Sequence, residues 1–181
     1  MIYMFLAEGF EEVEALCPLD LMRRAGLAVT TVGIGGLNIT GAHGITVKAD
    51  IPDTQYEDDT PELVFLPGGM PGTLNLAKSP VVERAIRAAL SHNAYLAAIC
   101  AAPSILGDMG LLRGKEAVCY PGFEERLLGA VYVSDGVVTD GNVTTARGMG
   151  FAIDLGLELV KLLSGEEQAR NLKAAIQHNA L

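Results

Sequence analysis

Residues 94–106 read Ala-Tyr-Leu-Ala-Ala-Ile-Cys-Ala-Ala-Pro-Ser-Ile-Leu. The apolar run 94–99 indicates a buried strand, and Pro103 suits the first turn of a helix. Because only three residues separate the two elements, we expect Cys100 on a sharp strand-to-helix elbow. Backbone N–H groups and the helix dipole would there stabilise a thiolate, the form of cysteine that acts as a nucleophile and is oxidised. The alternative is that Cys100 is a small, buried core residue.

The chain on both sides of this elbow alternates between strand and helix patterns. We predict strands at 1–6, 28–34, 63–66, 94–99, 116–119 and 130–133, an antiparallel excursion at 39–51, and a hairpin of 137–140 with 143–146. We predict helices at 12–24, 79–92, 148–163 and 166–177, and one that starts at Pro103. The first helix is expected to turn Val13, Leu16 and Leu19 (or Leu21) inward. Repeated β-α units with apolar strands predict an α/β sandwich with a mostly parallel sheet, and no linker divides residues 1–181, so a single domain is expected.

Composition excludes several classes of partner. The 181 residues are half hydrophobic and carry a net charge of −9, which argues against binding to nucleic acid or anionic membranes. No apolar run is long enough to span a membrane. The apolar start of the chain lacks the basic segment of a signal peptide, so a cytoplasmic location is expected.

The cysteines and histidines do not form a metal-binding pattern. The three cysteines are odd in number and widely spaced, and the three histidines lack ligand spacing, so we expect neither a disulfide framework nor a metal site. Cys17 is expected to be structural. Cys119 ends a predicted strand, where it either lines a pocket or packs in the core.

Three loops are predicted to meet at one edge of the sheet. In open α/β sheets, ligands bind beyond the carboxyl ends of the strands. The acidic stretch 8–14, the loop 67–72 (Pro-Gly-Gly-Met-Pro-Gly) and Cys100 each follow a predicted strand at that edge. Glu11 and Glu12 are explained by the preference for acids at helix N-termini, whereas Glu14 lies a turn further on and could point over the sheet edge. The Gly68-Gly69 pair is either a simple turn or a place where a backbone N–H faces the cleft, as in an oxyanion hole.

Electrostatics restricts how Glu14 could work with Cys100. An ionised carboxylate beside the thiol would raise the pKa of Cys100. We therefore expect a protonated Glu14 that donates a hydrogen bond to the thiolate, so that the two groups titrate as one coupled pair.

Several segments resemble the ThiJ/PfpI superfamily, and within it the Parkinson's-disease-associated protein deglycase (YajL-like) branch. The matching segments are AEGFEEVE at 7–14, MRRAG at 22–26, LPGG at 66–69, AAICAAP at 97–103 and TARG at 145–148. They occur in the family's order and span most of the chain. The resemblance implies a single glutamine amidotransferase-like domain with a flavodoxin-like three-layer sandwich, usually a homodimer, without a cofactor.

The resemblance also implies roles for individual residues. Cys100 matches the reactive cysteine and Glu14 its carboxylate partner, while Gly69 and Ala101 match the backbone donors to an oxyanion. The residues expected near the pocket are Gly68, Tyr120, Arg147, Glu11, Arg24 and His43. Many relatives carry a histidine where this chain has Ala101 or Tyr120, which disfavours a protease-like Cys-His pair. His43 stands where some relatives have an arginine contributed across the dimer.

The function expected on these grounds is a glyoxalase III/deglycase-type enzyme. Cys100 would add to methylglyoxal, glyoxal or an early glycation adduct, and a 2-hydroxy acid would be released. One alternative is an oxidative-stress sensor or thiol-dependent chaperone that uses an oxidisable cysteine without significant turnover. A third is a catalytically silent interaction protein, because the fold alone does not decide function.

Overall fold

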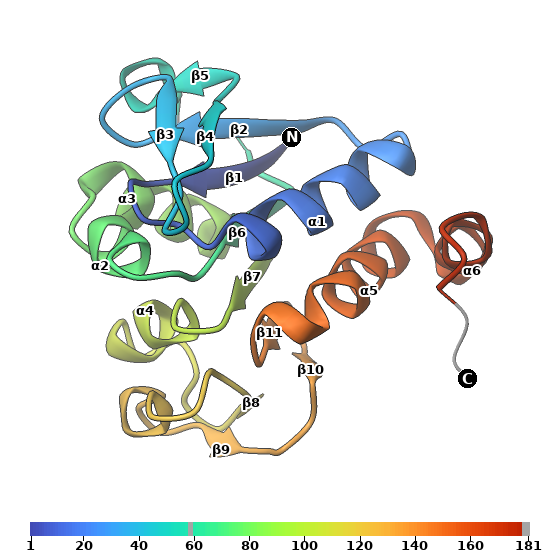
Figure 1. Ribbon diagram of the computed structural model, residues 1–181. Helices are drawn as coiled ribbons and strands as arrows, with labels where there is room; N and C mark the ends of the chain where they lie inside the picture. The colour runs from blue at the N-terminus through green and yellow to red at the C-terminus, as the bar shows by residue number, and fades with distance from the viewer. Residues whose placement is uncertain (58–59, 179–181) are drawn as a thin grey trace.

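A computed structural model describes residues 1–57 and 60–178 of the chain and shows an α/β sandwich around a seven-stranded sheet (Figure 1). The strand order is β10-β11-β7-β6-β1-β2-β5. Within the described residues, each neighbouring pair in this sheet is parallel except β10 with β11. The strands are β1 (Ile2–Leu6), β2 (Val29–Gly33), β5 (Ile51–Pro52), β6 (Leu63–Leu66), β7 (Tyr95–Ile99), β10 (Val137–Asp140) and β11 (Val143–Ala146). The predicted α/β class and mostly parallel sheet are confirmed.

Helices cover both faces of the sheet because its central strands are apolar on both sides. Tyr3 and Phe5 of β1 belong to one core cluster, and Ile2 and Met4 to the other. The first cluster packs against α2 (Gly72–Ala77), α3 (Pro80–Ser91) and α4 (Pro103–Asp108). The second packs against α1 (Glu12–Arg24), α5 (Ala152–Ser164) and α6 (Glu166–Ala175). In Figure 1 these two groups of helices lie on opposite sides of the strands.

Several predicted elements differ in extent. The segment 116–119 contributes only β8 (Glu116–Ala117), which pairs with β9 (Val131–Tyr132) in a separate small sheet. Within 39–51, β3 (Asn38–Thr40) and β4 (Thr46–Lys48) form the expected antiparallel pair, but Ile51 joins the main sheet beside β2. Helix α2 was not predicted. A 3₁₀ turn at Met149–Phe151 precedes α5.

The buried face of α1 also differs from the prediction. Leu19 and Leu21 are buried as expected, but the Val13 side chain is 44% exposed. The first turn of α1 instead buries Glu12 and Glu14, which are 4% and 1% exposed. The first turn of α1 therefore buries two carboxyl side chains and leaves the apolar residue between them, Val13, exposed.

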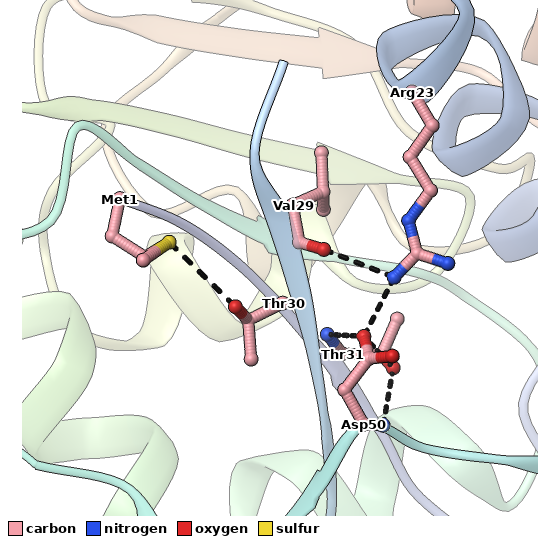
Figure 2. A network of polar contacts seen from close by, with 6 residues as sticks. All are labelled: Met1, Arg23, Val29, Thr30, Thr31 and Asp50. Carbon is pink, nitrogen blue, oxygen red and sulfur yellow. Dashed lines mark hydrogen bonds and ion pairs between the residues drawn. The ribbon is translucent and has the colours of Figure 1, made fainter. Parts of the chain in front are cut away.

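Asp50 fixes the end of α1 to the edge of the sheet (Figure 2). One of its carboxylate oxygens accepts hydrogen bonds from the Thr31 N–H and hydroxyl, both at 2.7 Å, and from the Arg23 guanidinium at 2.6 Å. Burial opposes ionisation, but the Thr31 hydrogen bonds and the charge of Arg23 outweigh it and lower the pKa of Asp50. Arg23 also donates to the Val29 carbonyl at 3.0 Å, which connects α1 to β2.

No helix in the described part of the chain combines the length and the apolar character needed to cross a membrane.

Candidate active site

Cys100 occupies the predicted elbow between β7 and α4. Its φ is +65°, in the left-handed region that non-glycine residues rarely adopt. The Cys100 N–H donates to the Ala146 carbonyl at 2.9 Å, and the Cys100 carbonyl accepts from the Tyr120 N–H at 2.8 Å. Contacts on both sides thus hold a conformation that costs about 1–3 kcal/mol. Such local strain is typical of active-site residues.

Glu14 lies next to Cys100, and Gly68 packs against both residues. A Cβ atom on Gly68 would lie 2.3 Å from Glu14 Oε2 and 2.6 Å from the Cβ of Cys100, so only glycine fits there. The Glu11 N–H donates to the Gly68 carbonyl at 2.9 Å and holds the start of α1 on the glycine loop. The three loops that were predicted to meet at the sheet edge therefore contact one another.

Burial sets the protonation of Glu14. Its side chain is inaccessible, and Oε2 has no hydrogen-bond partner among the described residues. Burial raises the pKa of Glu14 to about 7, although the Cys100 thiol and the N–H groups of Gly68 and Met149 oppose this by favouring the charged form. A carboxyl that changes protonation near neutral pH can both take and give a proton.

The thiol of Cys100 differs from its expected state. Burial, and next the negative charge of Glu14, raise the pKa of Cys100 to about 12, while the N–H groups of Gly69 and Ala101 oppose the rise. The expectation that the elbow lowers the pKa of this thiol is wrong, because two backbone donors do not offset burial beside a carboxylate. A thiolate at Cys100 is therefore disfavoured while Glu14 is ionised.

A pocket of about 390 Å³ opens over the pair. Seven residues expected at the site line it: Glu11, Glu14, His43, Gly69, Cys100, Ala101 and Tyr120. Sequence reasoning missed three further lining residues, Met70, Phe123 and Met149. Met70 follows directly after the glycine pair and could have been inferred, whereas nothing in the sequence signals Phe123 or Met149.

Three residues expected near the pocket do not line it. Gly68 is absent from the pocket lining and packs against Glu14 and Cys100. Arg24 lies in the last turn of α1, where it pairs with Asp20 at 2.5 Å. Arg147 follows β11, and its N–H donates to the Gly136 carbonyl at 2.9 Å.

Glu12 has a structural role that the sequence interpretation did not assign. Its Oε1 accepts from the N–H groups of His43 at 2.9 Å and Ile45 at 3.3 Å, and its Oε2 lies 3.0 Å from His43 Nδ1. These hydrogen bonds outweigh burial and lower the pKa of Glu12. Ligand atoms of Glu11, Glu12 and His43 lie within 4.8 Å of one another, close enough to hold a cation, but Glu12 is already occupied by the β3–β4 loop.

The other cysteines stand apart from this chemistry. Cys119 is fully buried in the core cluster that faces α3 and α4, and it does not line the pocket. Cys17 is half-buried on α1, and burial raises its pKa. Of the two alternatives for Cys119, the structure therefore shows core packing, and the position of Cys17 against the second core cluster agrees with the structural role expected for it.

The model of the DJ-1/PfpI family matches residues 1–162. The chain belongs to the DJ-1/PfpI family. It is 35% identical over 179 residues to the Parkinson disease protein 7 homolog of Danio rerio, covering 94% of this chain and 93% of that protein. It is 28% identical over 167 residues to the glutathione-independent glyoxalase DJR-1.2 of Caenorhabditis elegans, covering 91% and 89%.

Solved structures of DJ-1 proteins share its fold. The oxidised Toxoplasma gondii DJ-1 superimposes with a TM-score of 0.93 at 30% identity and covers 97% of both chains. Drosophila melanogaster DJ-1beta gives a TM-score of 0.91 at 32% identity, with 97% of this chain and 96% of that chain covered.

Proposed function

We propose that this DJ-1/PfpI protein is a cofactor-free enzyme of the glyoxalase III/deglycase type that acts on methylglyoxal, glyoxal or early glycation adducts. The observation that supports this most strongly is the Cys100–Glu14 pair at the base of a small pocket. Glu14, with a pKa of about 7, is matched to proton transfer at neutral pH. A pocket of about 390 Å³ suits a small aldehyde.

Four steps account for the reaction with methylglyoxal. Glu14 takes the Cys100 proton as the sulfur forms a bond to the aldehyde carbon, and it passes this proton to the aldehyde oxygen to give a hemithioacetal and a free Glu14 carboxylate. Glu14 next removes the C1 hydrogen as a proton and delivers it to the C2 oxygen, forming an enediol. Glu14 then takes the proton of the C1 hydroxyl and delivers a proton to C2, which gives a 2-hydroxy thioester. Water then attacks the thioester carbon, the C–S bond breaks, and lactate leaves as the Cys100 thiol is restored.

In this proposal the N–H groups of Gly69 and Ala101 stabilise the oxygen charge that develops in these steps. Both face the Cys100 sulfur, on which a substrate would be bound. Donors fixed before the reaction need no rearrangement as negative charge develops on oxygen. The relative from Caenorhabditis elegans that is named a glyoxalase supports the same reaction class.

Lactate formation from methylglyoxal tests the proposal. We expect turnover by wild type, and at least a 100-fold loss in Cys100→Ser and in Glu14→Gln. Cys17→Ser is the matched control, because Cys17 lies outside the pocket, and it should retain wild-type turnover. Equal rates in wild type, Cys100→Ser and Glu14→Gln would refute the mechanism. Selective dioxygenation of Cys100 by mild peroxide, with negligible turnover, would favour the stress-sensor alternative.

A further inference from the structure

The pocket contains an imidazole to which the proposed mechanism assigns no step. Among the described residues that line the pocket, His43 supplies the one imidazole. It comes from the loop between β3 and β4 and lines the same pocket as Cys100.

Glu12 holds this loop in a fixed position. Its carboxylate bonds to two backbone N–H groups of the loop and to His43 Nδ1, as described above. A Cβ atom on Gly41 would lie 2.3 Å from Glu12 Oε1, so the loop backbone packs directly on the carboxylate. Glu12 and Glu14 both lie in the first turn of α1. This turn therefore carries Glu14, the proposed base, and also fixes the β3–β4 loop that carries His43.

The hydrogen bond to Glu12 determines which ring nitrogen is available. With Nδ1–H donating to Glu12, Nε2 is the nitrogen left for a bound molecule; it accepts a hydrogen bond when the ring is neutral and donates one when the ring is protonated. The charged groups that face the ring are Glu12 at 3.0 Å and Glu11 at 3.4 Å, both from α1, and Glu14 lies deeper in the same pocket. The hydrogen bond with Glu12, and then the charges of Glu11 and Glu12, raise the pKa of His43 and extend its charged form toward neutral pH.

We infer that His43, in its protonated imidazolium form, is a substrate-binding residue whose Nε2–H donates a hydrogen bond to the second carbonyl oxygen of a 1,2-dicarbonyl compound bound at Cys100, and that Glu12 is its positioning residue. This rests on the proposed function and adds the residue that selects, among the proposed substrates, those with a second carbonyl oxygen. A simple aldehyde has no second oxygen for His43 to bind, so the site prefers 1,2-dicarbonyls. No bond is broken in this contact, which only orients the substrate.

Reaction of Cys100 with small probes tests the inference without any need for turnover. The rate of alkylation by neutral iodoacetamide is measured with and without methylglyoxal or propanal as a reversible protecting ligand. The variants are His43→Gln, Glu12→Gln and the control His92→Gln, which changes an exposed histidine on the far side of the fold. We expect methylglyoxal to protect wild type at about tenfold lower concentration than propanal, and His43→Gln to lose most of this preference.

A charged probe gives a second readout. Below the pKa of His43, the ratio of alkylation rates by anionic iodoacetate and neutral iodoacetamide should be about three- to tenfold higher in wild type than in His43→Gln. The iodoacetate-to-iodoacetamide ratios of wild type and His43→Gln should become equal by about pH 9, where His43 is neutral. Glu12→Gln should lower the pH at which the ratio falls, because it removes the carboxylate that stabilises the charged ring. Loss of packing alone would not shift this pH. Equal ratios and equal protection in wild type and His43→Gln would overturn the inference. Absence of lactate with these differences intact would refute the proposed function and leave the binding role of His43 standing.

Discussion

Glu14→Gln should gain stability relative to wild type as pH rises from 4 to 8, while it removes the proposed base. The pKa of Glu14 rises from its ordinary 4.5 to about 7 on folding, so between these values the unfolded chain loses a proton that the folded protein keeps. The stability linked to this proton is complete below pH 4.5 and is lost as pH rises through about 7. Each pH unit in this interval costs the folded state about 1.4 kcal/mol, a total of about 3 kcal/mol by pH 8.

Denaturant unfolding at several pH values between 4 and 8 measures this cost. The difference in free energy of unfolding between Glu14→Gln and wild type should shift in favour of the variant by about 3 kcal/mol from pH 4 to pH 8. Glu125→Gln, which changes an exposed carboxyl, serves as the control for loss of a charge. A difference that stays constant across this range would show that Glu14 does not titrate abnormally, and the reasoning from its burial would fail.

Three further substitutions follow from close contacts. Gly68→Ala should cost about 1–3 kcal/mol in denaturant unfolding and slow Cys100 alkylation, because the added methyl overlaps Glu14 and Cys100; an unchanged alkylation rate would contradict the packing described. Gly41→Ala should displace the Glu12 carboxylate and reproduce the effect of Glu12→Gln on the iodoacetate ratio. Asp50→Asn should cost about 1 kcal/mol at pH 7, since the ion pair with Arg23 is half-exposed. Because the pKa of Asp50 is lowered, this cost should shrink as pH falls below 3.8, and a cost independent of pH would argue against the network.

Local patterns predicted the elements that build the base of the site. The apolar run 94–99 followed by Pro103 was sufficient to predict the strand-to-helix elbow at Cys100. Helix α1 spans Glu12–Arg24, as predicted from the acidic residues at its start and the arginines at its end. The meeting of Glu14, Gly68 and Cys100 followed from one rule, that parallel strands end at a common edge.

Contacts between distant segments were not visible in the sequence. The segment after Glu116 was predicted as a longer strand, but the Val118 N–H donates to the Thr145 hydroxyl at 3.0 Å and the segment leaves its pairing with β9 after Ala117. Glu12 was interpreted as an ordinary helix-terminal acid because its partner His43 lies 31 residues away. The sign of the pKa shift at Cys100 depends on burial, which residue types alone do not give.

The pH dependence of Cys100 alkylation by iodoacetamide, in wild type and in Glu14→Gln, tests the central claim most directly. If Glu14 takes the thiol proton, wild-type reactivity rises in a step near pH 7, where the pair loses its first proton, and this step is absent in Glu14→Gln. A wild-type profile without that step, or the same profile in both proteins, would contradict the pairing of Cys100 with Glu14.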